Sequence, residues 1–227
     1  MLMKKKIKRI MVISLSIVIL FGMTVLIFMK HPKFGRIPTG ERLEKIQKSP
    51  HFVNGTFRNL NHTPQITGDK GFFGMMREYF SATNKKPINA IPSIKTDLLD
   101  LNSDENVLVW FGHSSYFIQI DGKRILVDPV FSGHSSPFSF SVKAFNGTDQ
   151  YSEEDIPEID YLVITHDHWD HLDYKTVVKL KSKVKKIITG LGTGSHFERW
   201  GFEPKLIVEM DWFEKNDFEN GFVFHAT

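Results

Sequence analysis

The longest apolar run in the chain lies near its N-terminus. Residues 10–29 carry no charge, and only Ser14, Ser16 and Thr24 among them are polar. Twenty such residues are enough for a helix to cross the hydrocarbon core of a bilayer. A cleaved signal peptide would have a shorter apolar stretch and a small-residue cleavage site, whereas a lysine, a histidine and a proline follow this run. We therefore predict an uncleaved transmembrane helix, with cleavage as the alternative.

Proline, glycine and asparagine recur between residues 32 and 106, which is typical of a connector with short ordered pieces. Thr39 is in position to cap a short helix that ends near Lys48 and carries its apolar residues on one side. Residues 71–81 contain a dense cluster of aromatic and methionine side chains. We predict that they form a helix packed on the domain, with contact to lipid or to an acyl chain as the alternative.

The second half of the chain shows strand patterns and then alternating strand and helix patterns. Asp121 and Gly122, between the second and third runs, are a strong hairpin signal. A meander followed by strands that alternate with helices predicts an α/β domain in which helices cover one face of a sheet. The predicted strands are residues 107–111, 116–120, 124–127, 161–164, 186–189 and 205–208, and the predicted helices are residues 173–183, capped by Asp173, and 195–200.

Length and composition indicate one domain with an appendage, because 227 residues with 41% apolar content can build a sizeable core. We divide the chain into a cytoplasmic basic tip with a membrane helix at residues 1–30, a connector at 31–106 whose short ordered pieces pack on the domain, and an incomplete domain at 107–227. The absence of cysteine excludes disulfides and zinc–thiolate sites. The net charge of +3 is too small to indicate a nucleic-acid-binding protein.

The distribution of charge around the apolar run predicts its orientation. Five basic side chains lie within the first nine residues, whereas Lys30, Lys33 and Arg36 flank the other end. Under the positive-inside rule this difference places the N-terminus in the cytoplasm. We therefore predict a single-pass protein of the cell membrane with its catalytic part outside the cytoplasm.

A dense group of candidate metal ligands, His166, His168, Asp170 and His171, follows the predicted strand 161–164 directly. Residues two apart share a side of an extended backbone, so His166 and His168 can present imidazoles to one cation. Asp170 and His171 come as the chain turns toward a helix, which places them near a second position. Imidazole and carboxylate without thiolate favour Zn²⁺, with Mn²⁺ or iron as alternatives. Packing alone does not explain this spacing of histidine and aspartate residues. The spacing therefore predicts a site for two metals.

Other chemical patterns in the sequence are weaker. A glycine-rich turn at residues 190–195 follows a strand, but Ser195 replaces the last glycine of the dinucleotide-binding pattern and the expected ribose-binding acidic residue is missing. Gly112 and Gly133 each open a sequence similar to the nucleophile elbow of serine hydrolases, and both sequences lack its final glycine. A solvated loop is the alternative for the histidine cluster itself.

The motif H-x-H-x-D-H is the signature of the metallo-β-lactamase-fold hydrolases, and the chain resembles them from about His51 onward. Within them it resembles most the branch that contains N-acyl-phosphatidylethanolamine-hydrolysing phospholipase D and its bacterial relatives. The segments that carry the resemblance to this branch are residues 110–114, with Gly112 and His113, residues 126–132, with Asp128, residues 136–137, residues 165–174 and residues 209–212.

The resemblance implies an αββα sandwich, of which this chain would supply the first half to two-thirds, and two zinc ions held by the four residues of the motif. Asp170 would also orient the attacking hydroxide. His113 would contact the substrate or a metal ligand, and Asp128 would brace the metal loop through backbone hydrogen bonds. Three other histidines are predicted to be structural: His134, His196 and His225.

We therefore expect a membrane-anchored, metal-dependent hydrolase, and more specifically a phosphodiesterase that acts on a lipid-like or small anionic substrate through a dizinc-bound hydroxide. One alternative is a lactonase that resembles the L-ascorbate-6-phosphate lactonases. Another is a noncatalytic, membrane-tethered metal-binding module. The expected partners are the lipid bilayer and a phospholipid or other small-molecule substrate, with no nucleic acid, and the sequence makes no prediction of oligomeric state.

The number of ligands suggests that the chain is a fragment. A catalytic zinc normally has three protein ligands, whereas the motif offers two to each metal. Between Leu172 and Thr227 no residue is an evident third ligand, since neither His196 nor His225 follows the end of a strand. In the resembling family the next histidine, a bridging aspartate and a final histidine come later in the sequence. We therefore expect the 227-residue chain to bind zinc weakly, to aggregate and to lack phosphodiesterase activity.

Overall fold

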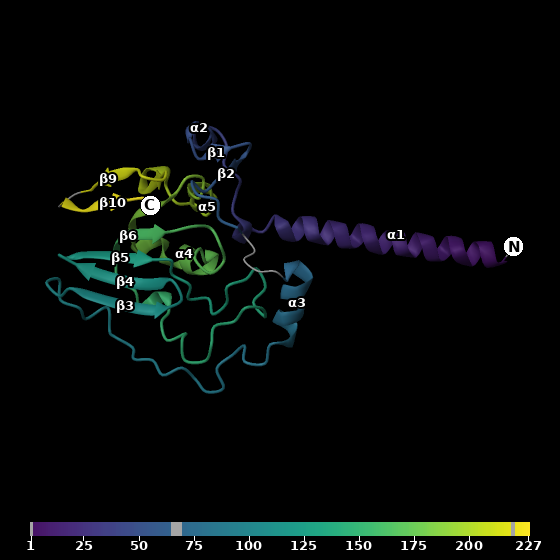
Figure 1. The fold of residues 1–227 in the computed structure, drawn as a ribbon, viewed down its shortest axis with the longest axis horizontal. Coiled ribbons are helices and arrows are strands. Elements are labelled where there is room, and N and C mark those ends of the chain that lie inside the picture. The colour runs from purple at the N-terminus through teal and green to yellow at the C-terminus, as the bar shows by residue number, and fades with distance from the viewer. Residues whose placement is uncertain (1, 65–69, 219–220) are drawn as a thin grey trace.

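Six strands form a mixed sheet in the order β3-β4-β5-β6-β7-β8 in the computed structural model, which describes residues 2–64, 70–218 and 221–227. The first three strands are antiparallel neighbours, and β5, β6, β7 and β8 run parallel to one another. This arrangement confirms the predicted meander followed by parallel strands (Figure 1). The strands are β3 (Val107–Gly112), β4 (Ser115–Ile120), β5 (Lys123–Val127), β6 (Ile159–Ile164), β7 (Val184–Gly190) and β8 (Ile207–Met210).

The hairpin between β4 and β5 forms as its sequence predicts. Asp121 and Gly122 both have positive φ angles, 48° and 72°, which is the conformation that a two-residue hairpin turn of the favoured twist requires. In β4, Ser115, Phe117 and Gln119 are buried and the residues between them are not. This alternation fixes which face of the sheet meets the core.

Helices cover one face of the sheet and enclose the main hydrophobic core. α4 (Tyr174–Leu180) and α5 (Gly194–Arg199) contribute Val177, Leu180 and Phe197, which are fully buried against sheet residues such as Leu162 and Ile187. α4 ends three residues earlier than predicted, because the chain continues as a 3-10 turn, η3 (Lys181–Lys183). A similar turn, η4 (Pro204–Leu206), precedes β8, so this strand begins at Ile207 and not at residue 205.

The opposite face of the sheet carries a smaller apolar cluster. A hairpin of β9 (Lys215–Asp217) and β10 (Val223–His225) places Phe218, Phe222 and Phe224 against Tyr161 of β6. Over β3, Leu108 and Trp110 remain 66% exposed on this face. The mixed sheet and its helices agree with the predicted first layer of a sandwich.

The connector is more firmly attached to the domain than its composition suggests. η1 (Pro32–Phe34) and α2 (Glu41–Lys48) pack on the domain, and the small strands β1 (Phe52–Val53) and β2 (Thr56–Phe57) follow. The predicted cap of α2 is wrong: the helix begins after Gly40 and not after Thr39. Gly40 has φ 58° and ψ −139°, a conformation that favours glycine, and this turn leaves Thr39 outside the helix.

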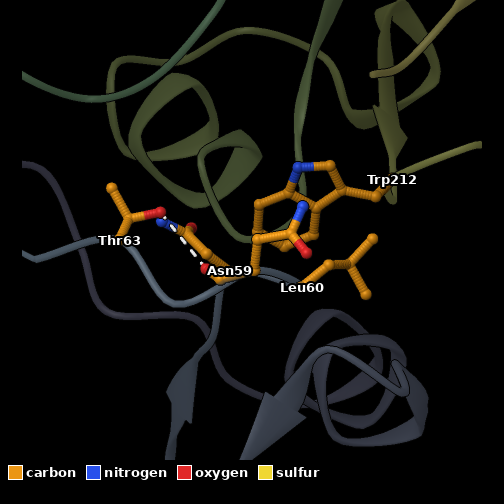
Figure 2. Close-up of a pocket in the computed structure, with 5 residues that line it drawn as sticks. Asn59, Leu60, Thr63 and Trp212 are labelled. Atoms are coloured by element: carbon orange, nitrogen blue, oxygen red, sulfur yellow. Dashed lines mark hydrogen bonds between the residues drawn. The ribbon is translucent and has the colours of Figure 1, made fainter.

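A shallow hollow lies where the connector meets the end of the domain. Figure 2 shows Asn59 and Leu60 beside Trp212, whose ring also contacts His51 at 5.1 Å and Phe57 at 5.6 Å between centroids. The hollow has a volume of about 220 Å³. Its lining side chains are amide, hydroxyl, aliphatic and indole groups without an ionisable member, so we do not assign the active site to it.

Two apolar helices stay outside the core. α1 (Leu2–Met29) projects away from the domain, and its stretch from Lys5 to Met29 is long and apolar enough to cross a membrane (Figure 1). α3 (Gly71–Ser81) has no buried residue, so its predicted packing on the domain is wrong. The chain carries α3 away from the sheet, to a position level with the domain-proximal end of α1 along the long axis of the molecule (Figure 1). Phe73 and Phe80, for example, are 86% and 72% exposed.

We expect Asp173→Ala to lower the free energy of unfolding by about 2 to 3 kcal/mol. The buried Asp173 carboxylate caps α4 by accepting a hydrogen bond from the Lys175 amide, and it also accepts bonds from Thr176 Oγ1 and the Ser132 amide. Chemical unfolding followed by circular dichroism measures the change. The matched control is Asp217→Ala, whose carboxylate is 75% exposed. Equal stability of the two variants would contradict this role.

Candidate metal centre

The predicted metal motif lies at the carboxyl edge of the parallel strands. β6 ends at Ile164, and the next residues turn away from the sheet toward α4. Because Val127 of β5 pairs with Val163 of β6, Asp128 and Thr165 meet directly beyond the ends of these strands. The carboxyl ends of parallel strands are where open α/β sheets place their ligands. The motif therefore occupies the edge at which the fold can gather side chains from several strands.

Three imidazoles of the motif converge. The ring of His166 lies 4.5 Å from the ring of His168 and 3.9 Å from the ring of His171, measured between centroids. His166 is therefore the common neighbour of the other two. The structure brings together the residues that the sequence assigns to the first metal and places His171 beside them.

A second group of donor atoms forms around Asp170. Its Oδ2 lies 3.7 Å from His171 Nε2 and 3.0 Å from His113 Nε2. The ligand atoms of His113, Asp170 and His171 all lie within 4.8 Å of one another. His113 arrives from the turn between β3 and β4, where it has a positive φ of 48°. The resemblance predicts that His113 contacts the substrate or a metal ligand, and the structure places it within hydrogen-bonding distance of Asp170.

Asp128 fixes the orientation of His171. The carboxylate is 1% exposed and accepts a hydrogen bond of 2.7 Å from His171 Nδ1. It also accepts bonds from the Thr165 amide at 2.8 Å and from Thr165 Oγ1 at 2.7 Å. The predicted bracing role of Asp128 is thus confirmed for the backbone and extends to two side chains. With Nδ1 occupied, the Nε2 lone pair of His171 is free to bind a metal on the side of Asp170.

The charges of the motif suit metal binding. Burial lowers the pKa of His166, and the neighbouring His171 and His168 lower it further, so the imidazole is held in the neutral form that ligates cations. For Asp170, burial raises the pKa, but a hydrogen bond from its own amide and the proximity of His171 and His113 outweigh burial and lower it. The site therefore combines neutral imidazoles with an ionised carboxylate, and this donor set fits a Zn²⁺ or iron ion.

A second brace holds Asp167, and the sequence did not reveal it. His196 Nε2 lies 3.3 Å from Asp167 Oδ2, and this hydrogen bond lowers the pKa of the carboxyl. The Arg36 amide donates to the other ring nitrogen, His196 Nδ1, at 2.9 Å. Gly35 is needed here because a Cβ would lie 1.7 Å from that nitrogen. His196 was predicted to be structural, and no spacing rule could have linked it to residue 36.

His134 and His225, which the sequence predicts to be structural, lie outside this cluster. His134 exchanges hydrogen bonds with Ser132 in a loop beside the site. His225 lies in β10 and pairs with Lys215 of the hairpin. The structure gives neither of them a contact with the four motif residues.

A pocket of about 620 Å³ opens beside the metal motif and includes His113 and Asp170 in its wall. Its other walls come from residues 91–94, from the end of β3 and from the segment 130–151. Aromatic and aliphatic side chains supply much of the surface, including Phe111, Phe131 and Phe145. A largely apolar pocket that ends on a few ionisable groups is the usual form of a small-molecule site. The arrangement can bind cations at one end of a pocket that accepts apolar groups.

The chain is similar to several known proteins. Residues 123–227 match the family described as Beta-lactamase superfamily domain. An uncharacterized protein of Mycobacterium tuberculosis is 32% identical over 169 residues, which are 73% of this chain and 45% of that protein. The chain thus spans about half the length of the curated relatives that it matches first. Further relatives bear the name UPF0173 metal-dependent hydrolase.

Two relatives have more informative names. N-acyl-phosphatidylethanolamine-hydrolyzing phospholipase D 1 of Caenorhabditis elegans is 28% identical over 54% of this chain and 36% of its own length. The crystal structure of CmlA, a diiron beta-hydroxylase from Streptomyces venezuelae, is 29% identical over 50% of this chain and 22% of its own chain, with a TM-score of 0.40. The match to the beta-lactamase superfamily domain and the similarity to this phospholipase D agree with the predicted metallo-β-lactamase fold and with the predicted resemblance to the phospholipase D branch.

We expect Asp128→Asn to weaken metal binding about 10- to 100-fold, because an amide cannot accept all the bonds that orient His171 and Thr165. Competition with a chromophoric chelator measures the Zn²⁺ affinity of the purified chain. The control is Asp160→Asn, since Asp160 lies at the other end of β6 and bonds to the Arg124 amide. Unchanged affinity in Asp128→Asn would remove this residue from the metal centre.

Proposed function

The chain carries a metallo-β-lactamase-fold domain of the beta-lactamase superfamily and has metal-dependent hydrolases among its relatives, and from this we propose that it belongs to a membrane-anchored phosphodiesterase. The observation that carries the proposal is the convergence of His113, Asp170 and His171 at the end of a largely apolar pocket. A lipid-like phosphodiester matches this pocket chemically. Its anionic phosphate would lie at the metal end, and its apolar groups would contact the apolar walls.

Two zinc ions are proposed, with His166 and His168 holding the first and Asp170 and His171 holding the second. When bound, such ions supply Lewis acidity and lower the pKa of water. Iron is the alternative, and CmlA, to which the chain is similar, is a diiron beta-hydroxylase. The hydrogen bond from His171 Nδ1 to Asp128 supports the assignment, because it is the usual partner of a ligating imidazole.

Asp170 and His113 are proposed to act on the reacting groups. The Asp170 carboxylate is ionised and faces the pocket, so it can accept a hydrogen bond from the attacking water and orient it. His113 Nε2 lies 3.0 Å from this carboxylate, and its side chain is 66% exposed at the pocket wall. It can therefore share a proton with Asp170 Oδ2 or donate a hydrogen bond to a phosphoryl oxygen.

The membrane anchor in the proposal is α1. Its apolar stretch is exposed in the structure from residue 10 to residue 27, which suits a helix surrounded by lipid. The N-terminus is proposed to be cytoplasmic and the domain to lie outside, on the basis of the basic residues before residue 10. The bilayer is thus both the proposed anchor point and the source of a lipid-like substrate.

In the protein that contains this chain, we expect Asp170→Asn to lower phosphodiester turnover by at least about 100-fold while the fold is retained. Hydrolysis of a phosphodiester is measured beside hydrolysis of a lactone. Asp160→Asn again serves as the control and should keep full activity. Lactone hydrolysis alone would show a lactonase, and bound metal without turnover of either substrate would show a noncatalytic module.

We expect His168→Ala to reduce the amount of metal that copurifies with the protein, since it removes a direct ligand. Elemental analysis measures the metal content, and His225→Ala is the matched histidine control outside the site. Equal metal content in the two variants would exclude His168 as a ligand.

The proposed topology predicts that protease added to intact cells digests the region after Lys30 and leaves the basic tip protected. An epitope at either end of the chain distinguishes the fragments on an immunoblot. Complete protection of the domain until the cells are lysed would reverse the topology or exclude the anchor.

A further inference from the structure

The domain-proximal end of α1 packs on a loop of the domain. Phe28, one residue before the end of α1, stacks on Phe138, with 5.4 Å between ring centroids and 6° between ring planes. Lys33 Nζ donates a hydrogen bond of 2.6 Å to the backbone oxygen of Pro137 and lies 4.3 Å from the centre of the Phe28 ring. Phe138 is therefore held at the level of the last helical turn.

This loop presents apolar side chains to its surroundings. Its tip, residues 138–142 and hereafter the aromatic tip, carries Phe138 at 45%, Phe140 at 77% and Val142 at 65% exposure. The aromatic tip is nevertheless built as a defined turn. The Ser141 amide donates to the Phe138 oxygen, and the Ser135 amide donates to the Val142 oxygen across the neck of the loop. Val142 has a φ of 46°, which a branched side chain rarely adopts and which the neck contacts maintain.

We propose that the aromatic tip is a second membrane contact, which enters the interfacial layer of the same bilayer that α1 crosses. This inference rests on the proposed anchoring by α1. If Met29 ends the membrane-spanning helix, its stacked neighbour Phe138 lies at the lipid–water interface, where aromatic side chains are favoured. Lys30 directly follows the helix, is exposed and can meet lipid phosphates.

A lipid surface is the occupant that fits this place best. A protein partner would have to share the space with the emerging end of α1, whereas lipid surrounds that end by the nature of a membrane span. The contact also bears on the candidate site. Residues at the base of the same loop, including Gly133, His134 and Lys143, line the pocket that holds His113 and Asp170. Insertion of the aromatic tip would hold the wall of this pocket against the bilayer.

The absence of cysteine allows a direct test, because one introduced cysteine gives one labelled position. The full chain, including α1, is reconstituted in phosphatidylcholine–phosphatidylglycerol vesicles after labelling of Phe140→Cys with an environment-sensitive fluorophore. Ile17→Cys, in the middle of α1, reports on the anchor itself. Leu108→Cys is the matched control, since Leu108 is also an exposed apolar residue, at 66%, and lies on β3 away from the aromatic tip. Lipids with nitroxide-labelled chains serve as the quencher.

We expect the label at position 140 to shift its emission to the blue and to lose about half its intensity with quencher lipids, as a group in the interfacial layer would. The label at position 108 should do neither. Quenching at position 17 with none at position 140 would show that the anchor inserts and that the aromatic tip does not, which overturns the inference alone. No quenching at position 17 would overturn the anchoring and the inference with it. Equal quenching at positions 140 and 108 would show nonspecific adsorption and would also contradict the inference.

Discussion

The candidate site depends on one buried carboxylate. Asp128 stands where β5 ends, is almost fully buried, and accepts hydrogen bonds from His171 and twice from Thr165. A buried charge of this kind is costly unless donors surround it, so its partners are held firmly in place. Its own backbone oxygen accepts a bond from Ser115 Oγ, which ties β4 to the same point. Thr165, directly before the motif, and His171, its last residue, are therefore both held by one carboxylate at the end of a neighbouring strand.

Much of the domain follows from local sequence patterns. The sheet strands and the cap of α4 at Asp173 form where alternation, turn residues and capping predict them, because each depends on a few adjacent residues. The metal motif is predictable for the same reason, since its four residues follow one strand. Local patterns could not predict that His113 lies beside Asp170. His113 lies in the turn between β3 and β4, Asp170 lies in the loop after β6, and only the folded sheet brings the two together. The sequence pattern also could not predict whether α3 packs on the domain or stays exposed. A helix needs apolar side chains both to pack on a domain and to contact lipid.

The connector shows why composition is a poor guide to attachment. Its proline and glycine content suggests a loose segment, yet Arg42 of α2 binds Glu198 at 2.9 Å and the buried Glu209 at 2.7 Å. Glu209 also accepts hydrogen bonds from the Gly192 and Gly194 amides, so both oxygens of its carboxylate have partners. Removing one partner of such a buried pair costs more than the pair contributes, because the other charge is left unpaired. The connector is thus part of the structure around the site.

The contacts of the connector leave little freedom between α1 and the loop that carries the candidate metal ligands. Directly after Met29, the backbone oxygens of Lys30 and Pro32 accept hydrogen bonds from Arg199 and from the Trp200 indole. A few residues later the Arg36 amide donates a hydrogen bond to His196, which in turn contacts Asp167, the residue between His166 and His168. An anchor joined by a free linker would let the domain tumble above the bilayer. Here hydrogen bonds connect the segment after α1 to the domain and to the motif. The orientation of α1 in a membrane would therefore fix the orientation of the candidate metal centre.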